Sequence, residues 1–266
     1  MKINYQETTS DLLTRIDIHN KFGARDIDAW MLQVLPLQPG MNILDVGCGA
    51  GKQCFSYYTH LNGQATITGG DVSAELLAQA KTLATQRNVP IRFVDLNFNK
   101  HFPQPDNTFD LVSCCFAIYY AENVPFTIQE MHRVLKPGGY LFTSGPMPEN
   151  KKMFYDIIRE ATGKTIPPMP GSSRYGSEFL TTIRKVFTSV DVQIFENPLT
   201  FDSVQPFIDY TRASLSEDRK LWNSFFQTKD DFEHIMAQIT DTAARWLARD
   251  GKLVMTKVVG GFIAKK

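Results

Sequence analysis

The sequence is poor in cysteine, and its cysteines lack the spacing of metal ligands. The four among 266 residues are Cys48, Cys54, Cys114 and Cys115, all inside or beside apolar runs that we expect to form core strands and ligand loops. Such placement favours small, reduced, buried thiols in a cytoplasmic protein over a disulfide framework or a zinc site. We therefore expect no bound metal.

Long apolar runs and an excess of charge are also missing. No stretch approaches the roughly 18 apolar residues of a membrane span, and residues 1–30 lack the apolar centre of a signal peptide. Lys plus Arg equals Asp plus Glu at 28 each, without a dense basic run. Because no net field would attract a polyanion, we expect neither a nucleic acid nor a membrane as partner. Nothing in this pattern indicates an oligomeric state.

From residue 41 onward, short apolar runs alternate with amphipathic segments. The strand-like runs cover residues 42–46, 65–69, 91–96, 109–117 and 140–144. A helical pattern follows the possible N-cap Ser73 and places on one face Leu76, Ala80, Leu83 and Ala84. Strands that alternate with helices predict βαβ units and a parallel sheet.

After residue 144 the regular alternation of strand-like and helical segments ends. Residues 145–176 hold five of the 14 prolines. The pattern then predicts helices over 151–161 and 178–188, a strand over 190–195, mostly helix over 202–250, and a last strand over 252–264.

A glycine-rich turn follows the first strand-like run. Asp45 ends that run, and Gly47, Gly49 and Gly51 stand at alternate positions after it. Glycines here let the backbone approach a ligand at the carboxyl end of a strand. The spacing does not match the dinucleotide pattern G-x-G-x-x-G, because the third glycine comes one residue early. A P-loop is excluded too, since Lys52 is not followed by Ser or Thr.

The motif acid-x-Gly-x-Gly-x-Gly resembles the first motif of the class I S-adenosylmethionine (SAM)-dependent methyltransferases. The run 130–139 is similar to the segment before their fifth strand. The resemblance covers about residues 41–145 and implies an α/β fold, a Rossmann-like seven-stranded mixed sheet in the order 3-2-1-4-5-7-6 with strand 7 antiparallel. On this template, residues 190–200 would be strand 6 and residues 252–265 strand 7.

The same template implies one compact catalytic domain with a helical cap. Its parts would be N-terminal cap helices in 1–40, the SAM-binding core in 41–145, a cap insertion with a helix and strand 6 in 146–200, a second helical insertion in 201–251, and strand 7 in 252–266. We expect the cap to cover the carboxyl edge of the sheet.

The resemblance also implies a set of cofactor-binding residues. The first turn, with Asp45, Gly47, Cys48, Gly49 and Gly51, would pass under the methionine and ribose of SAM. The other positions implied are Asp71 for the ribose hydroxyls, Val72 against the adenine, Asp95 for the adenine amino group, the backbone N–H of Leu96 for a ring nitrogen, and Cys115 and Phe116 at the methionine end. For Asp71, the alternative interpretation is an acid that stabilises a helix N-terminus.

Candidates for substrate contact are harder to read. Tyr119 and Tyr120 follow the fourth strand and either face the substrate or pack under the cap. Tyr120 is also a candidate catalytic residue. His19 is a candidate catalytic residue, with an exposed or helix-end histidine as the alternative. Tyr5 is a candidate to close over the ligands, and Arg174 a candidate to contact substrate.

These observations lead to a functional hypothesis. The chain is expected to transfer a methyl group from SAM to an O, N or C atom of a small organic acceptor by in-line displacement, leaving S-adenosylhomocysteine. It is similar to the methyltransferases of ubiquinone and menaquinone biosynthesis and of natural products. The alternatives are a methyltransferase of RNA or protein, and a SAM-binding protein without catalytic activity.

Overall fold

The computed structural model describes residue 3 and residues 8–167 and 170–266. The chain divides into two compact units. We call the stretch 27–147, with 170–195 and 259–266, the sheet unit. We call the remaining stretches, 1–26, 148–169 and 196–258, the helical unit. Each unit is described by itself.

The described strands form a seven-stranded sheet in the order β3-β2-β1-β4-β5-β7-β6, which confirms the expected topology. The strands are β1 (Asn42–Val46), β2 (Thr66–Asp71), β3 (Arg92–Asp95), β4 (Phe109–Cys115), β5 (Leu135–Pro146), β6 (Ser189–Phe201) and β7 (Leu253–Lys265). Strand β1 pairs in parallel with β2 and β4, whereas β5 pairs antiparallel with β7, as the template implied.

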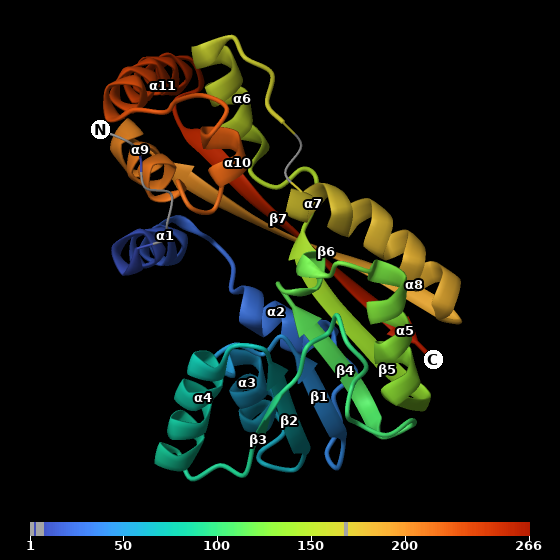
Figure 1. Cartoon of the computed structure of the whole chain (residues 1–266). Helices are drawn as coiled ribbons and strands as arrows, with labels where there is room; N and C mark the ends of the chain where they lie inside the picture. Colours follow the sequence, from blue (N-terminus) through green and yellow to red (C-terminus); the bar gives the residue numbers. More distant parts are fainter. Residues whose placement is uncertain (1–2, 4–7, 168–169) are drawn as a thin grey trace. The chain divides into compact units, whose positions relative to one another are not determined.

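Alternate residues of the central strands face two separate cores of the sheet unit. Ile43 and Leu111 belong to one core, and their neighbours Leu44 and Val112 belong to the other. The first core is covered by α2 (Ile27–Val34), α3 (Lys52–His60) and α4 (Ala74–Gln86), the second by α5 (Val124–Val134) and α8 (Leu180–Val186). Figure 1 shows α3 and α4 on one side of the strands and α5 and α8 on the other. This two-sided burial explains the nearly continuous apolar runs in the strands.

Helix α4 begins as the sequence predicts, and its buried face matches the predicted one in part. Ser73 is its N-cap and accepts a hydrogen bond from the backbone of Leu76. Leu77, Ala80 and Ala84 are buried, whereas the side chain of Leu76 remains 36% exposed. Of the predicted face, Ala80 and Ala84 are therefore buried and Leu83 is partly buried, whereas Leu76 lies at its edge, next to the buried Leu77.

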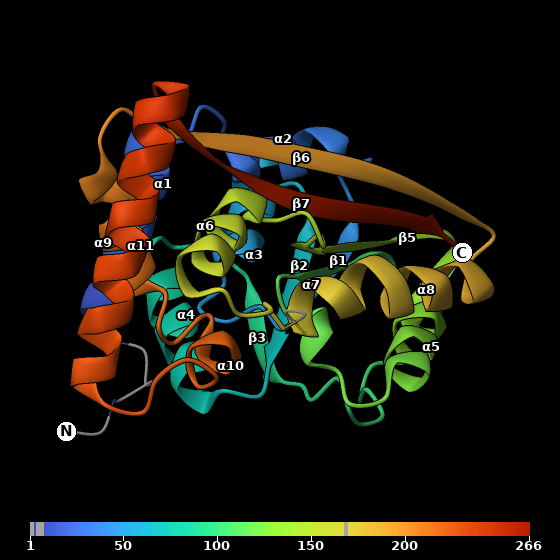
Figure 2. The same cartoon turned by 90° about the horizontal axis from the view of Figure 1, so that it is seen from above.

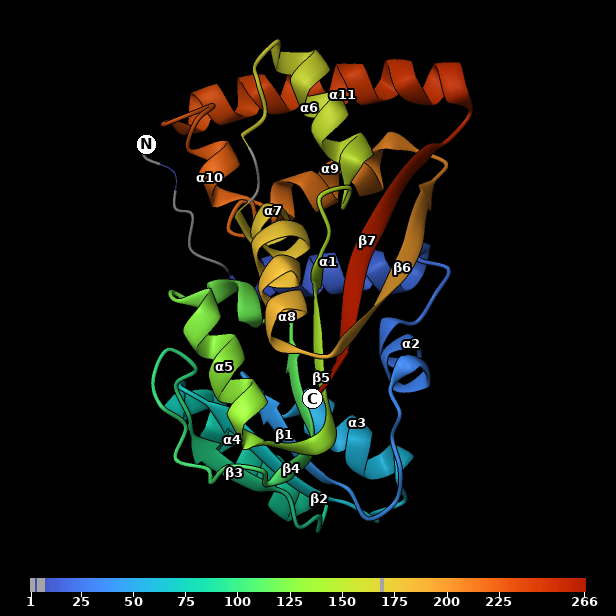
Figure 3. The ribbon, with the colours of Figure 1, turned by 90° about the vertical axis from the view of Figure 1, so that its right-hand side faces the viewer.

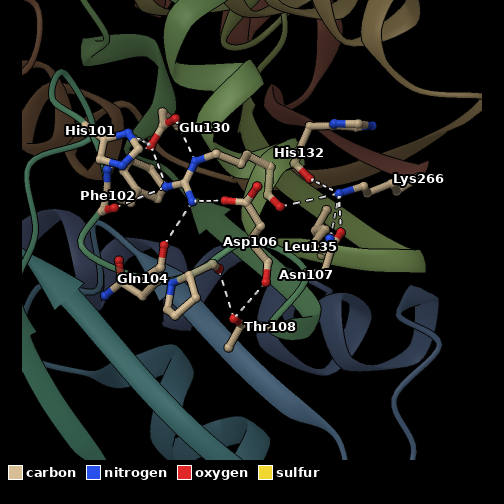
Figure 4. Close-up of polar contacts among 12 residues, drawn as sticks. His101, Phe102, Gln104, Asp106, Asn107, Thr108, Glu130, His132, Leu135 and Lys266 are labelled. Atoms are coloured by element: carbon tan, nitrogen blue, oxygen red, sulfur yellow. Dashed lines mark hydrogen bonds and ion pairs between the residues drawn. The ribbon is translucent and has the colours of Figure 1, made fainter.

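The loop between β3 and β4 is fastened to the end of α5 by Arg133. Its guanidinium donates to both carboxylate oxygens of Glu130 at 2.9 and 2.8 Å, and to Asp106 at 2.6 Å. It also donates to the carbonyls of Phe102 and Gln104 (Figure 4). These contacts keep the pKa of Glu130 below its usual value although burial alone would raise it.

A Pro- and Gly-rich segment leads from α7 (Pro170–Arg174) through a π-helical turn (Tyr175–Phe179) into α8. Tyr175 is fully buried and stacks on Phe262 with ring centroids 4.4 Å apart. Its hydroxyl lies 3.0 Å from the Thr143 hydroxyl and donates to the carbonyl of Gly260. This tyrosine is therefore a packing residue.

The helical unit has its own apolar core. Its helices are α1 (Thr9–Phe22), α6 (Lys152–Thr162), α9 (Val204–Ala213), α10 (Arg219–Trp222) and α11 (Lys229–Asp250). Helix α11 packs against α6 and α9, and α9 packs against α1 (Figures 2 and 3). Phe154, Phe207 and Trp222 are fully buried among them. Within the described residues, none of the helices is long and apolar enough to cross a bilayer.

Candidate functional site

The glycine turn after β1 has a backbone that other residues would not adopt easily. Gly47, Gly49 and Gly51 have φ angles of +71°, +54° and +84°. A Cβ on Gly51 would lie 2.8 Å from the ring of Phe93, closer than real Cβ atoms approach. The N–H of Gly47 donates to the carbonyl of Gly70 at 2.7 Å, which ties the turn to β2. The turn is therefore compact, and three of its five residues carry no side chain, at the carboxyl ends of β1 and β2.

Asp71 at the end of β2 holds this turn in place. One of its carboxylate oxygens accepts from the N–H of Gly49 at 2.8 Å, and the other accepts from the N–H of Ser73 at 2.9 Å. The second contact stabilises the start of α4, as the alternative interpretation of Asp71 as an acid at a helix N-terminus predicts. Each oxygen keeps a second lone pair for a ligand donor. Val72, the next residue, is 61% exposed.

Asp45 lies deeper than Asp71 and is only 2% exposed. Its carboxylate accepts from the Ser113 hydroxyl at 2.6 Å, and the Cys54 thiol lies 3.6 Å from its other oxygen. Burial raises its pKa to about 7, although these two hydrogen bonds lower it. Asp45 therefore joins β1 to β4 and α3 and is poised to change protonation near neutral pH.

Helix α3 contributes two polar side chains that the sequence analysis missed. The amide nitrogen of Gln53 and the hydroxyl of Tyr57 are buried and make no hydrogen bond to the described residues. Burial, followed by charges at Cys115 and Asp45, raises the pKa of Tyr57 well above its usual value. Orphaned buried donors are rare and mark a place for a ligand or an ordered water. A glutamine two residues after the third glycine, at the start of a helix, was the available signal.

Asp95 is the last residue of β3, the strand next to β2, and Leu96 follows it. Asp95 pairs in register with Asp71 and is exposed. The N–H of Leu96 donates to the carbonyl of Asp71 at 3.0 Å. The expectation that this N–H is available to a ring nitrogen is therefore wrong. The reason is that the β2–β3 ladder continues one residue beyond the end of β3.

The end of β4 has an unusual backbone. Phe116 has a φ of +55°, its N–H donates to the carbonyl of Ser144 at 2.9 Å, and its side chain is 37% exposed. A non-glycine residue in this conformation at a strand end is often a functional position. Burial raises the pKa of the neighbouring Cys115 thiol well above its usual value, which argues against a thiolate nucleophile there.

Tyr119 and Tyr120 belong to a short 3-10 helix, Ile118–Tyr120, whose backbone carbonyls accept hydrogen bonds from Arg174. The guanidinium of Arg174 donates to the carbonyls of Tyr119 at 3.1 Å and Ala121 at 3.0 Å, and to Glu178 at 2.8 Å. These contacts make Arg174 a positioning residue for the turn. Tyr120 is 70% exposed and lies beside Tyr119, with ring centroids 4.8 Å apart. Substrate contact by these three residues stays a prediction.

His19 lies on α1 in the helical unit. Its ring packs edge-on against Tyr210 with centroids 5.8 Å apart. Burial, followed by the charge of Lys257, lowers its pKa to about 3. His19 is therefore neutral at pH 7, and a catalytic role for it stays a prediction. Tyr5 lies outside the described residues.

No group of three His, Cys, Asp or Glu side chains within the described part of the chain could hold a metal ion. The glycine turn, Asp71 and Asp95 together form a candidate polar ligand site at the carboxyl ends of β1, β2 and β3.

Known proteins similar to this chain are methyltransferases. Residues 44–143 match the family model of a methyltransferase domain. This stretch thus resembles a methyltransferase domain. The chain is 39% identical over 110 residues to a probable methyltransferase, ltbC, from Aspergillus luteorubrus, which covers 38% of each chain. It is 28% identical over 146 residues to the ubiquinone/menaquinone biosynthesis C-methyltransferase UbiE of a Shewanella strain, covering 53% of this chain and 56% of that protein.

The fold of the methyltransferase domain also recurs in solved structures. A SAM-dependent methyltransferase from Aquifex aeolicus aligns over 72% of this chain and 91% of that one, with a TM-score of 0.52 and 20% identity. The predicted resemblance to class I methyltransferases is thus confirmed for the core. The chain spans about half or less of the length of the two curated relatives, 38% and 56%.

Proposed function

We propose that this protein is a SAM-dependent methyltransferase that acts on a small organic acceptor. The observation that carries the proposal is the joined set of Asp71, Asp95 and the glycine turn. Asp71 fixes the turn through Gly49 and stands in register with Asp95, so two carboxylates lie at the strand ends beside the glycine turn. The methyltransferase domain covers the same residues, and the Aquifex aeolicus neighbour is a SAM-dependent enzyme.

The residues present fit an adenosyl group. The free lone pairs of Asp71 suit two ribose hydroxyls, and the exposed Asp95 suits an exocyclic amine. Val72 and Phe116 offer partly exposed apolar surface, 61% and 37%, for the adenine and the methionine chain. The orphaned amide of Gln53 is a further polar group near the buried Asp45 end of the turn.

When bound, SAM supplies a methyl group on a sulfonium with a neutral leaving group. The chain's own contribution is then chiefly to hold the acceptor in line and exclude water, and alignment of this kind is worth about 7–11 kcal/mol. A general base helps only where the acceptor must lose a proton. A pKa of about 3 makes His19 a weak base at neutral pH.

A small acceptor is favoured over a macromolecule. The formal net charge is zero, with 28 basic and 28 acidic residues, so no broad field attracts a polyanion. UbiE, one of the relatives, is a C-methyltransferase of quinone biosynthesis. We propose a small molecule of comparable class as acceptor. Incubating the protein with methyl-labelled SAM and a metabolite extract, followed by mass analysis, would identify the labelled product.

Calorimetric titration with SAM and S-adenosylhomocysteine tests the proposal directly. We expect one ligand per chain. Asp95→Ala should weaken binding by about tenfold, because it removes one charge-assisted hydrogen bond from an exposed residue. Asp71→Ala should weaken binding further, because it also frees the glycine turn. Glu75→Ala, a change of another exposed acid close by on α4, is the matched control and should leave binding unchanged. Failure of the wild-type protein to bind either compound would refute the proposal.

A further inference from the structure

The sheet unit has a groove that the proposed SAM site does not account for. Its lining residues come from α3 and α4, together with Leu32 of α2 and Ala50 of the glycine turn, and its volume is about 650 Å³. Helices α3 and α4 cover the same face of the sheet (Figure 1). Asp71 and Asp95, which we assign to SAM, are not among the lining residues. Sites for small molecules usually have volumes of about 300–1,000 Å³, so the groove has the size of a ligand site.

One part of the lining is apolar. Leu32, Phe55 and Leu83 belong to it, and two hydroxyl groups on α3, those of Ser56 and Thr59, stand beside them. Phe55 is only 6% exposed, whereas Leu32 and Leu83 are half-buried. A lining that is mostly apolar and has a few polar groups suits a ligand with a hydrocarbon body.

Arg87, at the end of α4, contributes a cation to the same groove. Its guanidinium carbon lies 4.9 Å from the centre of the Phe55 ring. Within the part of the chain that the structure describes, this guanidinium forms no ion pair and donates no hydrogen bond. A guanidinium against an aromatic ring keeps the N–H donors at its edge open, and these donors match a carboxylate in two parallel hydrogen bonds.

The groove does not supply an anion for Arg87. Among the described residues, no Asp or Glu lines it. The other lining ammonium, that of Lys52, already has an anionic partner in Asp28 at 2.7 Å. The groove therefore offers one guanidinium without an anionic partner beside an apolar surface.

We propose that this groove binds a small amphipathic acid, with its carboxylate on Arg87 and its hydrocarbon body against Leu32, Phe55 and Leu83. Two contributions add up in such a complex: apolar area is removed from water, and the carboxylate accepts charge-assisted hydrogen bonds. An exposed ion pair alone contributes little, so both parts of the ligand are needed. The site does not depend on the proposed methyl transfer.

Titrations of the full-length protein with three probes test the two parts separately. Naphthaleneacetate has a hydrocarbon body and one negative charge, naphthaleneacetamide has the same body without the charge, and acetate has the charge without the body. We expect naphthaleneacetate to bind at least about tenfold more tightly than either of the others. Equal binding of the acid and its amide would overturn the role of Arg87. Equal binding of the acid and acetate would overturn the role of the apolar lining.

Substitutions at exposed positions locate the site. Arg87→Gln should weaken naphthaleneacetate binding by about tenfold, to the level of the amide, and Arg87→Lys should keep part of the charge-dependent affinity. Arg92→Gln, at an exposed arginine of β3 outside the groove, is the matched control. Thr59→Trp places an indole ring in the groove and should abolish binding, whereas Thr82→Trp, at an exposed threonine of α4 outside it, should not. Binding that is indifferent to Arg87→Gln and Thr59→Trp, or that the control changes weaken equally, would overturn the site.

A measurement on the wild-type protein does not depend on any variant. Naphthaleneacetate should shift the backbone amide resonances of Ser56, Thr59 and Arg87 in an NMR titration, and saturating S-adenosylhomocysteine should not displace it. Shifts confined to other residues, or displacement by S-adenosylhomocysteine, would mean that the probe binds elsewhere and would overturn the groove as its site.

Discussion

At the scale of single residues, Asp45 at the start of the glycine turn has a pKa near neutral pH. It is buried, accepts from Ser113 at 2.6 Å, and has a pKa raised by burial to about 7 from an ordinary value of 3.8. The folded protein therefore binds more protons than the unfolded chain between about pH 4 and pH 7. The free energy of unfolding must fall as the pH rises through this window.

Asp45→Asn should remove that dependence. At about 1.4 kcal/mol per pKa unit, the wild-type protein should lose about 2–3 kcal/mol more than the variant between pH 5 and pH 8. Urea unfolding at both pH values measures the difference. Parallel pH profiles for the two proteins would show that Asp45 is ionised in the folded state throughout.

A substitution of Gly51 tests whether the turn requires a residue without a side chain at this position. Gly51 and Gly40 have nearly the same φ, +84° and +86°, but a Cβ on Gly51 would meet Phe93 at 2.8 Å while one on Gly40 would meet nothing within 4 Å. Gly40→Ala should therefore cost only the backbone strain, about 1–2 kcal/mol. Gly51→Ala should cost about 1–3 kcal/mol more because of the overlap.

Thermal unfolding of the two glycine variants, with SAM titration of each, makes this comparison. We expect Gly40→Ala to bind SAM like the wild-type protein and Gly51→Ala to bind it more weakly. Equal stability and equal binding of the two variants would mean that Phe93 moves aside without cost.

At the scale of elements, the C-terminal end of α5 depends on a residue far away in the chain. The ammonium of Lys266 donates to the carbonyls of His132 at 2.8 Å and Leu135 at 2.7 Å, and to Asn107 at 2.9 Å (Figure 4). A cation at a helix C-terminus satisfies carbonyls that lack intrahelical partners and interacts favourably with the helix dipole.

Lys266→Met should therefore lower the free energy of unfolding by about 1–2 kcal/mol. Lys100→Met, at an exposed position of the sheet unit, is the control and should change it by less than about 0.5 kcal/mol. Chemical denaturation measures both. A loss of the same size in the two variants would show that Lys266 contributes no more than an ordinary surface lysine.

The sequence predicts the elements that have strong periodic patterns and fails where tertiary packing decides. The runs 42–46 and 252–264 match β1 and β7 closely, because apolar strands bounded by turns give clear signals. That Leu77 is buried while Leu76 lies at the edge of the buried face depends on how α4 packs against β2 and β3, which a helical repeat of similar residues does not determine. The occupied N–H of Leu96 likewise depends on how far the β2–β3 ladder extends.

Across the whole molecule, the glycine turn and the buried charged group of the helical unit differ in how readily the sequence reveals them. The glycine turn is one continuous stretch, so its motif can be read directly. The charged group of the helical unit brings together Arg15, Lys151, Tyr210, Glu217 and Lys257 from five separate segments. No local pattern joins them, so only the fold reveals the group. The division at residues 40, 145, 200 and 251, with its cap, stays a prediction.

The balance of charge over the whole chain also makes a prediction. Because basic and acidic residues cancel at 28 each, the protein should not be retained on an RNA matrix even at about 50 mM salt. Retention that falls steeply as salt is added would favour the alternative of an RNA methyltransferase. Column binding over a salt series decides between these outcomes.

The most direct test of the central assignment is a crystal structure of the protein grown with S-adenosylhomocysteine. We expect the ribose hydroxyls within hydrogen-bond distance of the Asp71 carboxylate, the adenine amine near Asp95, and the homocysteine chain along the turn from Gly47 to Gly51. A ligand bound elsewhere, or bound with both carboxylates out of its reach, would contradict it.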